Sequence, residues 1–359
     1  MMKLKNKLLI LLIIVMLVFS IGFSVSAALD VHFIDVGQGD AVLIQSRETN
    51  VLIDAGDRYS SIATKMVNYL SSNNVERLDA VFSTHPHADH IGGMSAIINN
   101  FDVSRIYDSG KIHTSRTYED YLILIDEEDI PFSTPRRGDK IEVSELTFNV
   151  LHPGENIESY SLNNASIVLH LEYEDISFLF TGDLEASGED EIVNSNIDIE
   201  STVLKVAHHG SRTSTQEHFL EEVSPEVAII QVGKDNRYDH PSPEVINLLQ
   251  SKRVDIYRSD YHGDIVINTD GKDYSVSTAM ELEQQKAEPQ VEEDAAELIN
   301  INTASQSTLE VLHGIGPATA QNIIEYRENN NGFQTKEEIK NVSGIGPATY
   351  DNIKDDITI

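Results

Sequence analysis

The feature that most constrains this chain is a histidine cluster that directly follows an apolar run. The stretch STHPHADHIGG starts at Ser83 and places three imidazoles and one carboxylate between His85 and His90. The preceding run LDAVF is typical of a buried strand, so the cluster is expected on a loop at that strand's C-terminal end. Gly92 and Gly93 then let the backbone turn into a helix without crowding the cluster. These ligand types predict a site for one or two divalent metal ions.

The pattern of the surrounding chain predicts a layered α/β sandwich. From Leu29 to about Tyr274, short β-rich runs such as VHFIDVG, NVLIDAG, LTFNVLH and EVAIIQVG alternate with helical stretches. Ser60–Ser72 and Pro243–Ser251 are two of the expected helices. Many strands with interleaved helices favour sheets covered by helices.

Composition divides the chain into four segments. Lys3, Lys5 and Lys7 precede the apolar run Leu8–Phe19, and small residues follow up to Ala27. This order predicts a signal peptide over residues 1–27, with an uncleaved N-terminal anchor as the alternative. The later segments are expected to be the α/β sandwich domain over 28–276, an acidic linker over 277–297 and a helical module over 298–359. The mature chain is therefore expected to be secreted or at the cell surface, without stable membrane insertion if the signal is cleaved.

Charge and cysteine content exclude several classes of protein. The formal net charge is −33, which argues against general electrostatic attraction to nucleic acid and indicates a self-repelling, soluble surface. The chain has no cysteine, which excludes thiolate-ligated zinc and structural disulfides. Any binding to DNA must therefore depend on local sites.

Several motifs then identify a family resemblance. The pattern HxHxDHxGG resembles that of the metallo-β-lactamase superfamily. The ordered motifs DVGQGDAVLIQ, LFTGDLE, LKVAHHGS and NRYDHPSPEV narrow the resemblance to the extracytoplasmic hydrolase domain of the ComEC family of DNA-uptake channel proteins. The resemblance does not extend to that family's channel portion, so we do not expect this chain to be a channel. It implies an αββα sandwich and metal-dependent hydrolysis.

The resemblance also implies which residues bind metal. Carried over by position, the ligands would be His85, His87, Asp89, His90, Asp183 and one of His208 or His209. Asp183 is placed to bridge two ions. The family's usual third-motif histidine has no clear counterpart, which leaves His152 open as a further ligand. Zinc is the expected metal, with manganese as the alternative.

Other residues are expected around these ligands. Asp54 would orient a ligand from behind, and Asp40 would do the same or close a turn. His240 would lie at the mouth of the site, where it binds phosphate or protonates a leaving oxygen. The expected catalytic residues are Asp89, Asp183, His209 and His240, and the expected substrate contacts are Asn164, Ser166, Ser211, Asn236 and Tyr238. Whichever of His208 and His209 does not bind metal would face substrate.

The C-terminal module contains an internal repeat, LHGIGPATAQNI and VSGIGPATYDNI. Its two turns resemble the helix-hairpin-helix motif and, from Leu298 onwards, the DNA-binding domain of the ComEA family of competence receptors. The turn residues are Gly314, Ile315 and Gly316 in the first copy and Gly344, Ile345 and Gly346 in the second. Backbone N–H groups at such helix starts bind DNA phosphates, while the central isoleucine packs inward. Asn302 is the expected cap of the first helix. A structural or protein-binding helix pair is the alternative.

Together these features favour an exported, metal-dependent phosphodiesterase that cuts DNA, with the tail holding the substrate nearby. Bound divalent ions lower the pKa of water to about 7 and polarise a phosphoryl or carbonyl oxygen. The ligands alone do not choose among phosphodiester, lactone and amide. One alternative is therefore a cell-surface esterase, lactonase or phosphocholine-type esterase. A second is a DNA-capture protein with a purely structural metal site. Strand preference, endo- or exonuclease action and oligomeric state stay open.

Overall fold

The computed structural model describes residues 28–280 and 298–359, except 305, 310, 311, 313, 314, 331 and 355. The chain divides into two compact units between Glu283 and Gln284, and each unit is described by itself. The predicted signal peptide, most of the predicted linker and Gly314 lie outside the described residues. The boundaries predicted for these segments therefore stay predictions.

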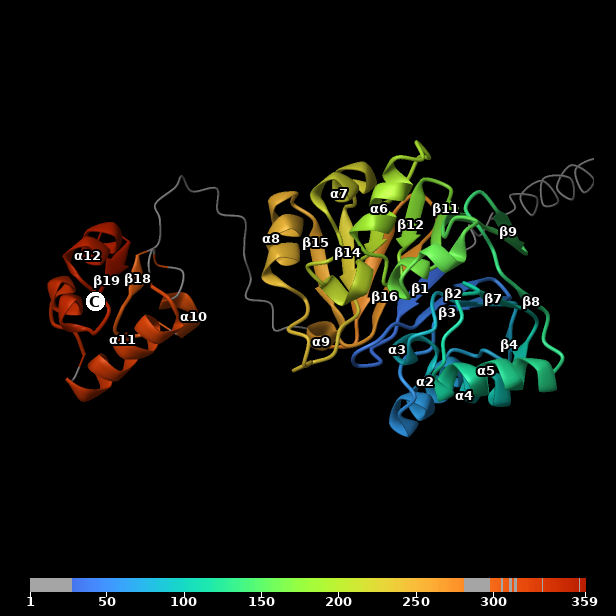
Figure 1. Cartoon of the computed structure of the whole chain (residues 1–359), viewed down its shortest axis with the longest axis horizontal. Helices are drawn as coiled ribbons and strands as arrows, with labels where there is room; N and C mark the ends of the chain where they lie inside the picture. The colour runs from blue at the N-terminus through green and yellow to red at the C-terminus, as the bar shows by residue number, and fades with distance from the viewer. Residues whose placement is uncertain are drawn as a thin grey trace, which may run out of the picture. The chain divides into compact units, whose positions relative to one another are not determined.

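Two β-sheets form the centre of the larger unit (Figure 1). The eight-stranded sheet has the order β17 (Tyr274–Thr278), β16 (Ile265–Thr269), β1 (Leu29–Phe33), β2 (Val42–Ser46), β3 (Thr49–Ile53), β5 (Ala80–Ser83), β7 (Ile106–Asp108) and β8 (Phe132–Ser133). The seven-stranded sheet has the order β15 (Asp255–Arg258), β14 (Val227–Ile230), β13 (Val203–Lys205), β12 (Ile176–Phe180), β11 (Val168–Tyr173), β10 (Leu146–His152) and β9 (Lys140–Val143). A separate parallel pair joins β4 (Arg77–Leu78) and β6 (Asp102–Val103).

Strand residues alternate between two cores, because successive side chains in a strand point to opposite faces of the sheet. Val42 and Ile44 of β2 pack into the core between the two sheets, together with Phe148 and Phe178 of the other sheet. Leu43, between them, packs on the outer face with the helices. Because both faces of the sheets are apolar, they must be covered on both sides.

Helices cover both outer faces (Figure 1). The eight-stranded sheet carries α2 (Ser60–Ser72), α4 (Met94–Asn100) and α5 (Arg116–Glu127), and the seven-stranded sheet carries α6 (Ala186–Val193), α7 (Glu217–Val223) and α8 (Pro243–Ser251). The short helices α3 (Ala88–Ile91) and α9 (Ser259–His262) and the 3₁₀ turns η1 (Ile157–Ser159), η2 (Asn163–Ala165) and η3 (Ala207–Gly210) lie in connections. The predicted αββα sandwich is confirmed, and α2 and α8 have the predicted bounds.

The smaller unit consists mainly of helices around its own core. Its elements are β18 (Ile299–Asn300), α10 (Gln306–Leu309), α11 (Pro317–Asn329), η4 (Lys336–Asn341), α12 (Pro347–Ile353) and β19 (Ile357–Thr358). Ile315 and Ile345 are buried in this core, so the inward packing of both turn isoleucines is confirmed. The parallel pair β18–β19 is an addition to the predicted all-α module.

One predicted helix cap in this unit is wrong. The side chain of Asn302 does not cap a helix start but bonds to Phe333: its Nδ2 donates to the Phe333 carbonyl oxygen (2.9 Å) and its Oδ1 accepts from the Phe333 N–H (2.7 Å). Asn302 therefore joins the start of the module to the segment after α11.

Within the described ranges, no helix combines the length and apolar character needed to cross a bilayer.

Candidate metal centre

The histidine cluster lies where strands of both sheets end. β5 runs into His85, β12 into Asp183, and β13 into His208 and His209. β3 and β5 are parallel neighbours in one sheet, and β12 and β13 are parallel neighbours in the other. The carboxyl ends of parallel strands meet at one edge, where α/β folds build their ligand sites.

The two glycines after the cluster allow a close backbone contact. A Cβ on Gly92 would lie 2.1 Å from the backbone nitrogen of Arg58, and one on Gly93 would lie 2.2 Å from the Ala55 carbonyl oxygen. The same segments are joined by a hydrogen bond from the Ala55 N–H to the His90 carbonyl oxygen (2.7 Å). Glycine is therefore needed because the turn packs against residues 55–58, which lie after β3.

His85, His87 and Asp183 form the first group of converging ligand atoms, all within 4.8 Å of one another. His85 Nε2 lies 3.0 Å from His87 Nδ1 and 3.6 Å from Asp183 Oδ2. His85 and Asp183 are buried, and His87 is partly exposed. This group is open to solvent through His87.

Asp89, His90 and His209 form the second group. His209 Nε2 lies 3.5 Å from Asp89 Oδ2, and His90 Nε2 lies 3.2 Å from Asp183 Oδ1. Asp183 Oδ1 is also 3.6 Å from His209 Nε2. One oxygen of Asp183 thus faces each group, which is the arrangement that a bridging carboxylate needs.

Asp54 holds His90 from behind. Its carboxylate accepts hydrogen bonds from the Thr84 N–H (2.8 Å) and the Thr84 hydroxyl (2.6 Å), and lies 2.8 Å from His90 Nδ1. Asp54 is completely buried. A carboxylate that accepts the Nδ1 proton directs Nε2 of the same ring towards the cluster.

Asp40 and Lys205 lie behind His209. Asp40 Oδ1 is 3.3 Å from His209 Nδ1, which also bonds to the Gln231 carbonyl oxygen (2.9 Å). The Lys205 ammonium pairs with Asp40 and donates to the Gly182 carbonyl oxygen (3.3 Å). Both charged side chains are almost fully buried. Asp40 therefore contacts a predicted ligand, and its backbone carbonyl oxygen accepts the Gly56 N–H (2.9 Å).

The charges in this cluster attract positive charge. Burial alone would lower the pKa of His209, but Asp183 and then Asp40 raise it to about 10. Burial likewise opposes the rise in the pKa of His90, which Asp183, Asp54 and Asp40 place well above its usual value. For Asp183, burial would raise the pKa, yet His90 and His209 hold it well below its ordinary range. The carboxylates thus favour cationic charge here, as protons on imidazole or as a divalent ion.

Unused ligand atoms at the centre fit a divalent metal ion. His90 Nε2, His209 Nε2 and Asp183 Oδ1 are buried without a hydrogen-bond partner. A buried polar atom without a partner is costly, and these three are directed at one another. Imidazole nitrogens with carboxylate oxygens suit zinc, manganese or iron.

Comparison with known proteins agrees with this geometry. Residues 34–234 match the family described as "Metallo-beta-lactamase superfamily". The chain belongs to this superfamily. Residues 294–358 match the "Helix-hairpin-helix motif". The superfamily implies divalent metal ions, while the identity of each ligand stays a prediction.

Curated relatives match the two parts of the chain separately. "ComE operon protein 3" of Bacillus subtilis (strain 168) is 35% identical over 252 residues, which cover 66% of this chain and 32% of that protein. "Competence protein ComA" of Neisseria gonorrhoeae is 31% identical over 232 residues, which cover 64% of this chain and 30% of that protein. "ComE operon protein 1" of Bacillus subtilis (strain 168) is 50% identical over 62 residues, which cover 17% of this chain and 30% of that protein. The chain spans about a third of the length of these relatives. The predicted fusion of a competence-related metallo-β-lactamase domain with a helix-hairpin-helix module is confirmed.

In this metallo-β-lactamase domain the adjacent histidines His208 and His209 differ in environment. His209 is buried among the ligand atoms, whereas His208 is partly exposed, with Nε2 3.8 Å from Asp183 Oδ2 and 3.4 Å from Asn163 Nδ2. Its ring meets that of His240 edge-on, with centroids 5.7 Å apart. The geometry therefore favours His209 as the ligand and His208 as the group that faces substrate.

Both histidines have a left-handed backbone. His208 has φ 49° and ψ 46°, and His209 has φ 54° and ψ 23°. This conformation costs a residue with a side chain roughly 1–2 kcal/mol. The two rings lie edge-on with centroids 6.1 Å apart, and each has a nitrogen within 4 Å of Asp183. Backbone strain of this kind is common at functional sites.

His152, the open ligand candidate, lies apart from both groups. Its Nδ1 is 3.2 Å from the Ser166 carbonyl oxygen, its Nε2 is 3.8 Å from Glu191 Oε2, and its ring packs against Tyr160. Burial lowers its pKa to about 4. None of the converging groups among the described residues contains His152, so a ligand role has no support in this structure.

The predicted substrate contacts divide into buried and exposed side chains. Asn164 Oδ1 accepts the N–H groups of Glu185 and Gly188, and the buried Ser166 hydroxyl accepts the Asp183 N–H (3.1 Å). Ser211 is also buried, and its hydroxyl bonds to Thr213. All three side chains bond to other residues of the domain in this structure, and their role in contacting substrate stays a prediction. The exposed candidates lie on the loop that carries Asn236, Tyr238 and His240.

Sequence reasoning missed Lys205 and the Gln231 carbonyl oxygen. A signal for Lys205 was present, since it is the one charged residue in the apolar strand that leads to the paired histidines. A lysine that interrupts such a strand requires a buried partner. The Gln231 contact had no signal, because a backbone carbonyl carries no residue identity.

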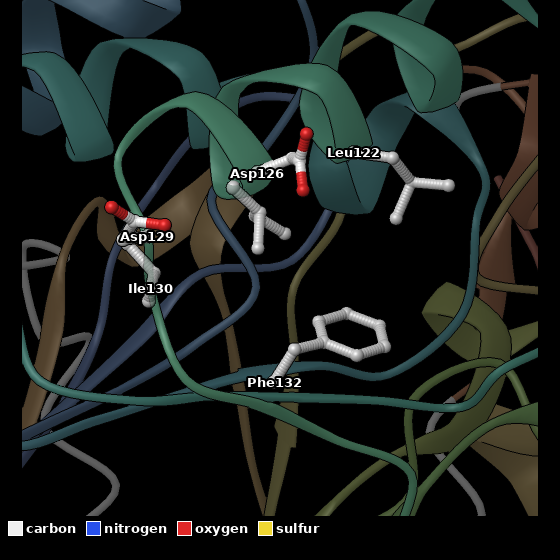
Figure 2. A pocket seen from close by; sticks show the side chains of 6 residues that line it. Leu122, Asp126, Asp129, Ile130 and Phe132 are labelled. Carbon is white, nitrogen blue, oxygen red and sulfur yellow. The ribbon is translucent and has the colours of Figure 1, made fainter.

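A separate groove near the edge of the eight-stranded sheet does not belong to the centre. It has a volume of about 390 Å³ and lies between α5 and β8, lined by Leu122, Ile125, Asp126, Asp129, Ile130 and Phe132 (Figure 2). Its lining contains two carboxylates and no imidazole. The groove lacks the mixed ligand set that distinguishes the metal centre.

Proposed function

We propose that the chain is an exported, metal-dependent phosphodiesterase that acts on DNA. The observation that carries this proposal is the presence, in one chain, of a divalent-metal ligand set and a helix-hairpin-helix module. The relatives with competence names support a DNA substrate. Export rests on the sequence of residues 1–27, which lie outside the described residues.

The ligand roles follow from the two groups of converging atoms. His85 and His87 would hold one ion, His90 and His209 with Asp89 would hold a second, and Asp183 would contact both. Such ions supply a hydroxide nucleophile at neutral pH and polarise the phosphoryl oxygen. Asp54 would orient the His90 imidazole and Asp40 that of His209, because each carboxylate lies next to the Nδ1 atom of the ring.

The residues that face outwards would handle the substrate. His208 and His240 lie at the open side of the cluster, where an imidazole can donate a proton to a departing oxygen. Burial and the nearby His208 lower the pKa of His240 to about 4, so its neutral form dominates near pH 7 in this environment. A phosphodiester drawn into this space would bring its own negative charge and favour the protonated form.

The helix-hairpin-helix module would hold DNA by its backbone. Gly316 and Gly346 precede α11 and α12, are exposed, and have no atom within 4 Å of the position that a Cβ would take. Free space at a helix start lets a phosphate approach the N–H groups. Because the chain carries a net charge of −33, we expect modest affinity with a shallow dependence on salt.

The test is cleavage of DNA by the purified full-length chain. Single- and double-stranded oligonucleotides are incubated with zinc or manganese, alongside His87→Ala and the double variant Gly316→Val/Gly346→Val. We expect wild type to cleave, His87→Ala to be inactive, and the glycine variant to show a raised KM. Absence of cleavage with either metal would reject the nuclease.

The two alternative functions predict different results for the same protein and its variants. Turnover of small chromogenic esters, lactones or phosphocholine diesters that survives deletion of residues 298–359 would favour a small-molecule esterase. Retention of DNA without turnover, lost in the glycine variant, would favour a capture protein.

A further inference from the structure

The loop between β14 and α8 is held in one conformation by Asn236. The Asn236 amide donates to the carbonyl oxygens of Gly233 (2.9 Å) and His240 (2.7 Å), and its Oδ1 accepts the N–H groups of Tyr238 and His240 (both 3.1 Å). All of its hydrogen-bonding capacity is directed into the loop itself. Asn236, predicted to contact substrate, is instead the residue that fixes the positions of Tyr238 and His240.

Four side chains form a continuous series of contacts from this loop to the metal centre. Arg237 lies over the Tyr238 ring, 4.9 Å from its centroid, and also donates to the Tyr238 hydroxyl (2.7 Å). The Tyr238 ring stacks on His240 with centroids 5.8 Å apart and planes 24° apart. His240 in turn contacts His208, whose Nε2 is 3.8 Å from Asp183. Arg237 forms the outer end of the series and is exposed, and Tyr238 is 48% exposed.

This arrangement suits a flat, aromatic ligand. The exposed Arg237–Tyr238 pair, on a loop held by internal hydrogen bonds, offers a planar surface at low entropic cost, and the guanidinium adds cation–π attraction. The net charge of −33 disfavours contacts with a phosphate backbone, so contacts that do not depend on charge gain importance near the site. Inside a DNA duplex the base faces are already stacked, so unpaired nucleotides present far more free base faces than a duplex does.

From this geometry we infer that Tyr238, with Arg237, is a stacking platform for an unpaired nucleobase next to the phosphate that lies at His208 and His240. The inference rests on the proposed DNA phosphodiesterase and gives it a substrate preference for single strands or unpaired ends. Stacking on an aromatic side chain strengthens binding by roughly 5- to 150-fold per base. Tyr238 is a binding residue in this scheme, so its substitution acts mainly on KM.

The chain itself supplies a direct test, because it contains no tryptophan. Tyr238→Trp in the full-length protein introduces a single indole at the platform. A phosphorothioate single strand should quench its fluorescence, whereas an abasic strand of the same length and a blunt duplex should not. Equal responses to base-containing and abasic strands, or no response to either, would overturn the platform.

A matched control site lies on α9. Tyr261 is 50% exposed and has the Arg258 guanidinium 4.1 Å from its ring centroid, but its ring contact is with Arg258 and not with the His240–His208 series. Tyr261→Trp therefore reports on general binding of DNA to an exposed aromatic ring. Its fluorescence should change little on addition of the single strand, and quenching equal to that of Tyr238→Trp would contradict a specific site.

Kinetics separate this inference from the proposed function. Tyr238→Ala should raise KM for single-stranded DNA by roughly 5- to 150-fold, and Tyr238→Phe should keep the wild-type KM. The rise in KM caused by Tyr238→Ala should be much smaller on an abasic strand. If wild type cleaves DNA and Tyr238→Ala has an unchanged KM, the platform is rejected and the phosphodiesterase stands. If wild type cleaves no DNA, the fluorescence result still decides whether bases stack at Tyr238.

Discussion

The two sides of the candidate metal centre are built by different means. On the inner side, His90 and His209 are buried, and each has its Nδ1 directed at a buried carboxylate, Asp54 or Asp40. On the outer side, His208 and His240 contact each other through their ring edges and are partly exposed. The inner side fixes ligand atoms before any ion binds, whereas the outer side leaves its two imidazoles partly exposed. In the proposed function, the inner side would hold the metal and the outer side would handle the substrate.

The largest effect is expected from Asp183→Asn, because Asp183 lies next to both groups of converging ligand atoms. An amide cannot supply two anionic oxygens, so zinc affinity should fall by more than about 100-fold. That figure is the upper range for loss of a residue that only hydrogen-bonds to a metal ligand. Cobalt titration followed by its ligand-field spectrum measures this independently of activity. Asp190→Asn, at an exposed carboxylate paired with His218, is the control and should match wild type. Wild-type cobalt affinity in Asp183→Asn would contradict the bridging role.

The next effect concerns Lys205, which pairs with Asp40 behind His209. Lys205→Met leaves a buried carboxylate without its main counter-charge and frees it to reorient. We expect metal affinity to fall by roughly 10- to 100-fold, as for other partners that orient a ligand. Lys234→Met, at an exposed lysine outside the centre, is the control. Equal metal affinity in both variants would show that Asp40 orients His209 without help from Lys205.

A smaller effect is expected at Asp108, a buried carboxyl group at the end of β7. Burial, opposed by the hydrogen bond from the Gly110 N–H, raises the pKa of Asp108 to about 7. The unfolded carboxyl titrates near pH 3.9, so the folded state binds the proton more tightly, and stability falls as pH rises between about pH 4 and pH 7. Asp108→Asn removes this loss and should gain about 1–3 kcal/mol over wild type near pH 8, with little gain near pH 4.

Urea unfolding at several pH values measures the Asp108 effect. The exposed Asp120, which pairs with Arg116, provides the control variant Asp120→Asn, whose stability should differ from that of wild type by a constant amount across the range. A pH-independent difference between Asp108→Asn and wild type would contradict the raised pKa.

The inner side could be predicted from the sequence to a much greater extent than the outer side. His85, His87, Asp89, His90 and Asp183 lie in two contiguous motifs after apolar strands, and the structure brings all five together. The choice between His208 and His209 could not be predicted, because it depends on backbone angles that the pattern HHG does not specify. The sequence predicts substrate contacts at Asn164 and Ser166 from motif position alone. Their burial arises from contacts with residues 183–188, which are distant in sequence.

The smallest effect isolates the backbone strain at His208. His208→Gly and His208→Ala both remove the imidazole, so the difference between them reports the left-handed conformation alone. Glycine adopts φ 49° without steric cost, so His208→Gly should be more stable than His208→Ala by about 1 kcal/mol in urea unfolding. The matched control is Ser211, where φ is −60°: Ser211→Gly should be less stable than Ser211→Ala, because glycine there only adds freedom to the unfolded chain.

Both His208 variants should retain the metal while losing turnover, because the imidazole lies on the outer side. If His208→Gly is no more stable than His208→Ala, the loop does not hold its left-handed turn in solution, and the contrast between His208 and His209 loses its structural cause.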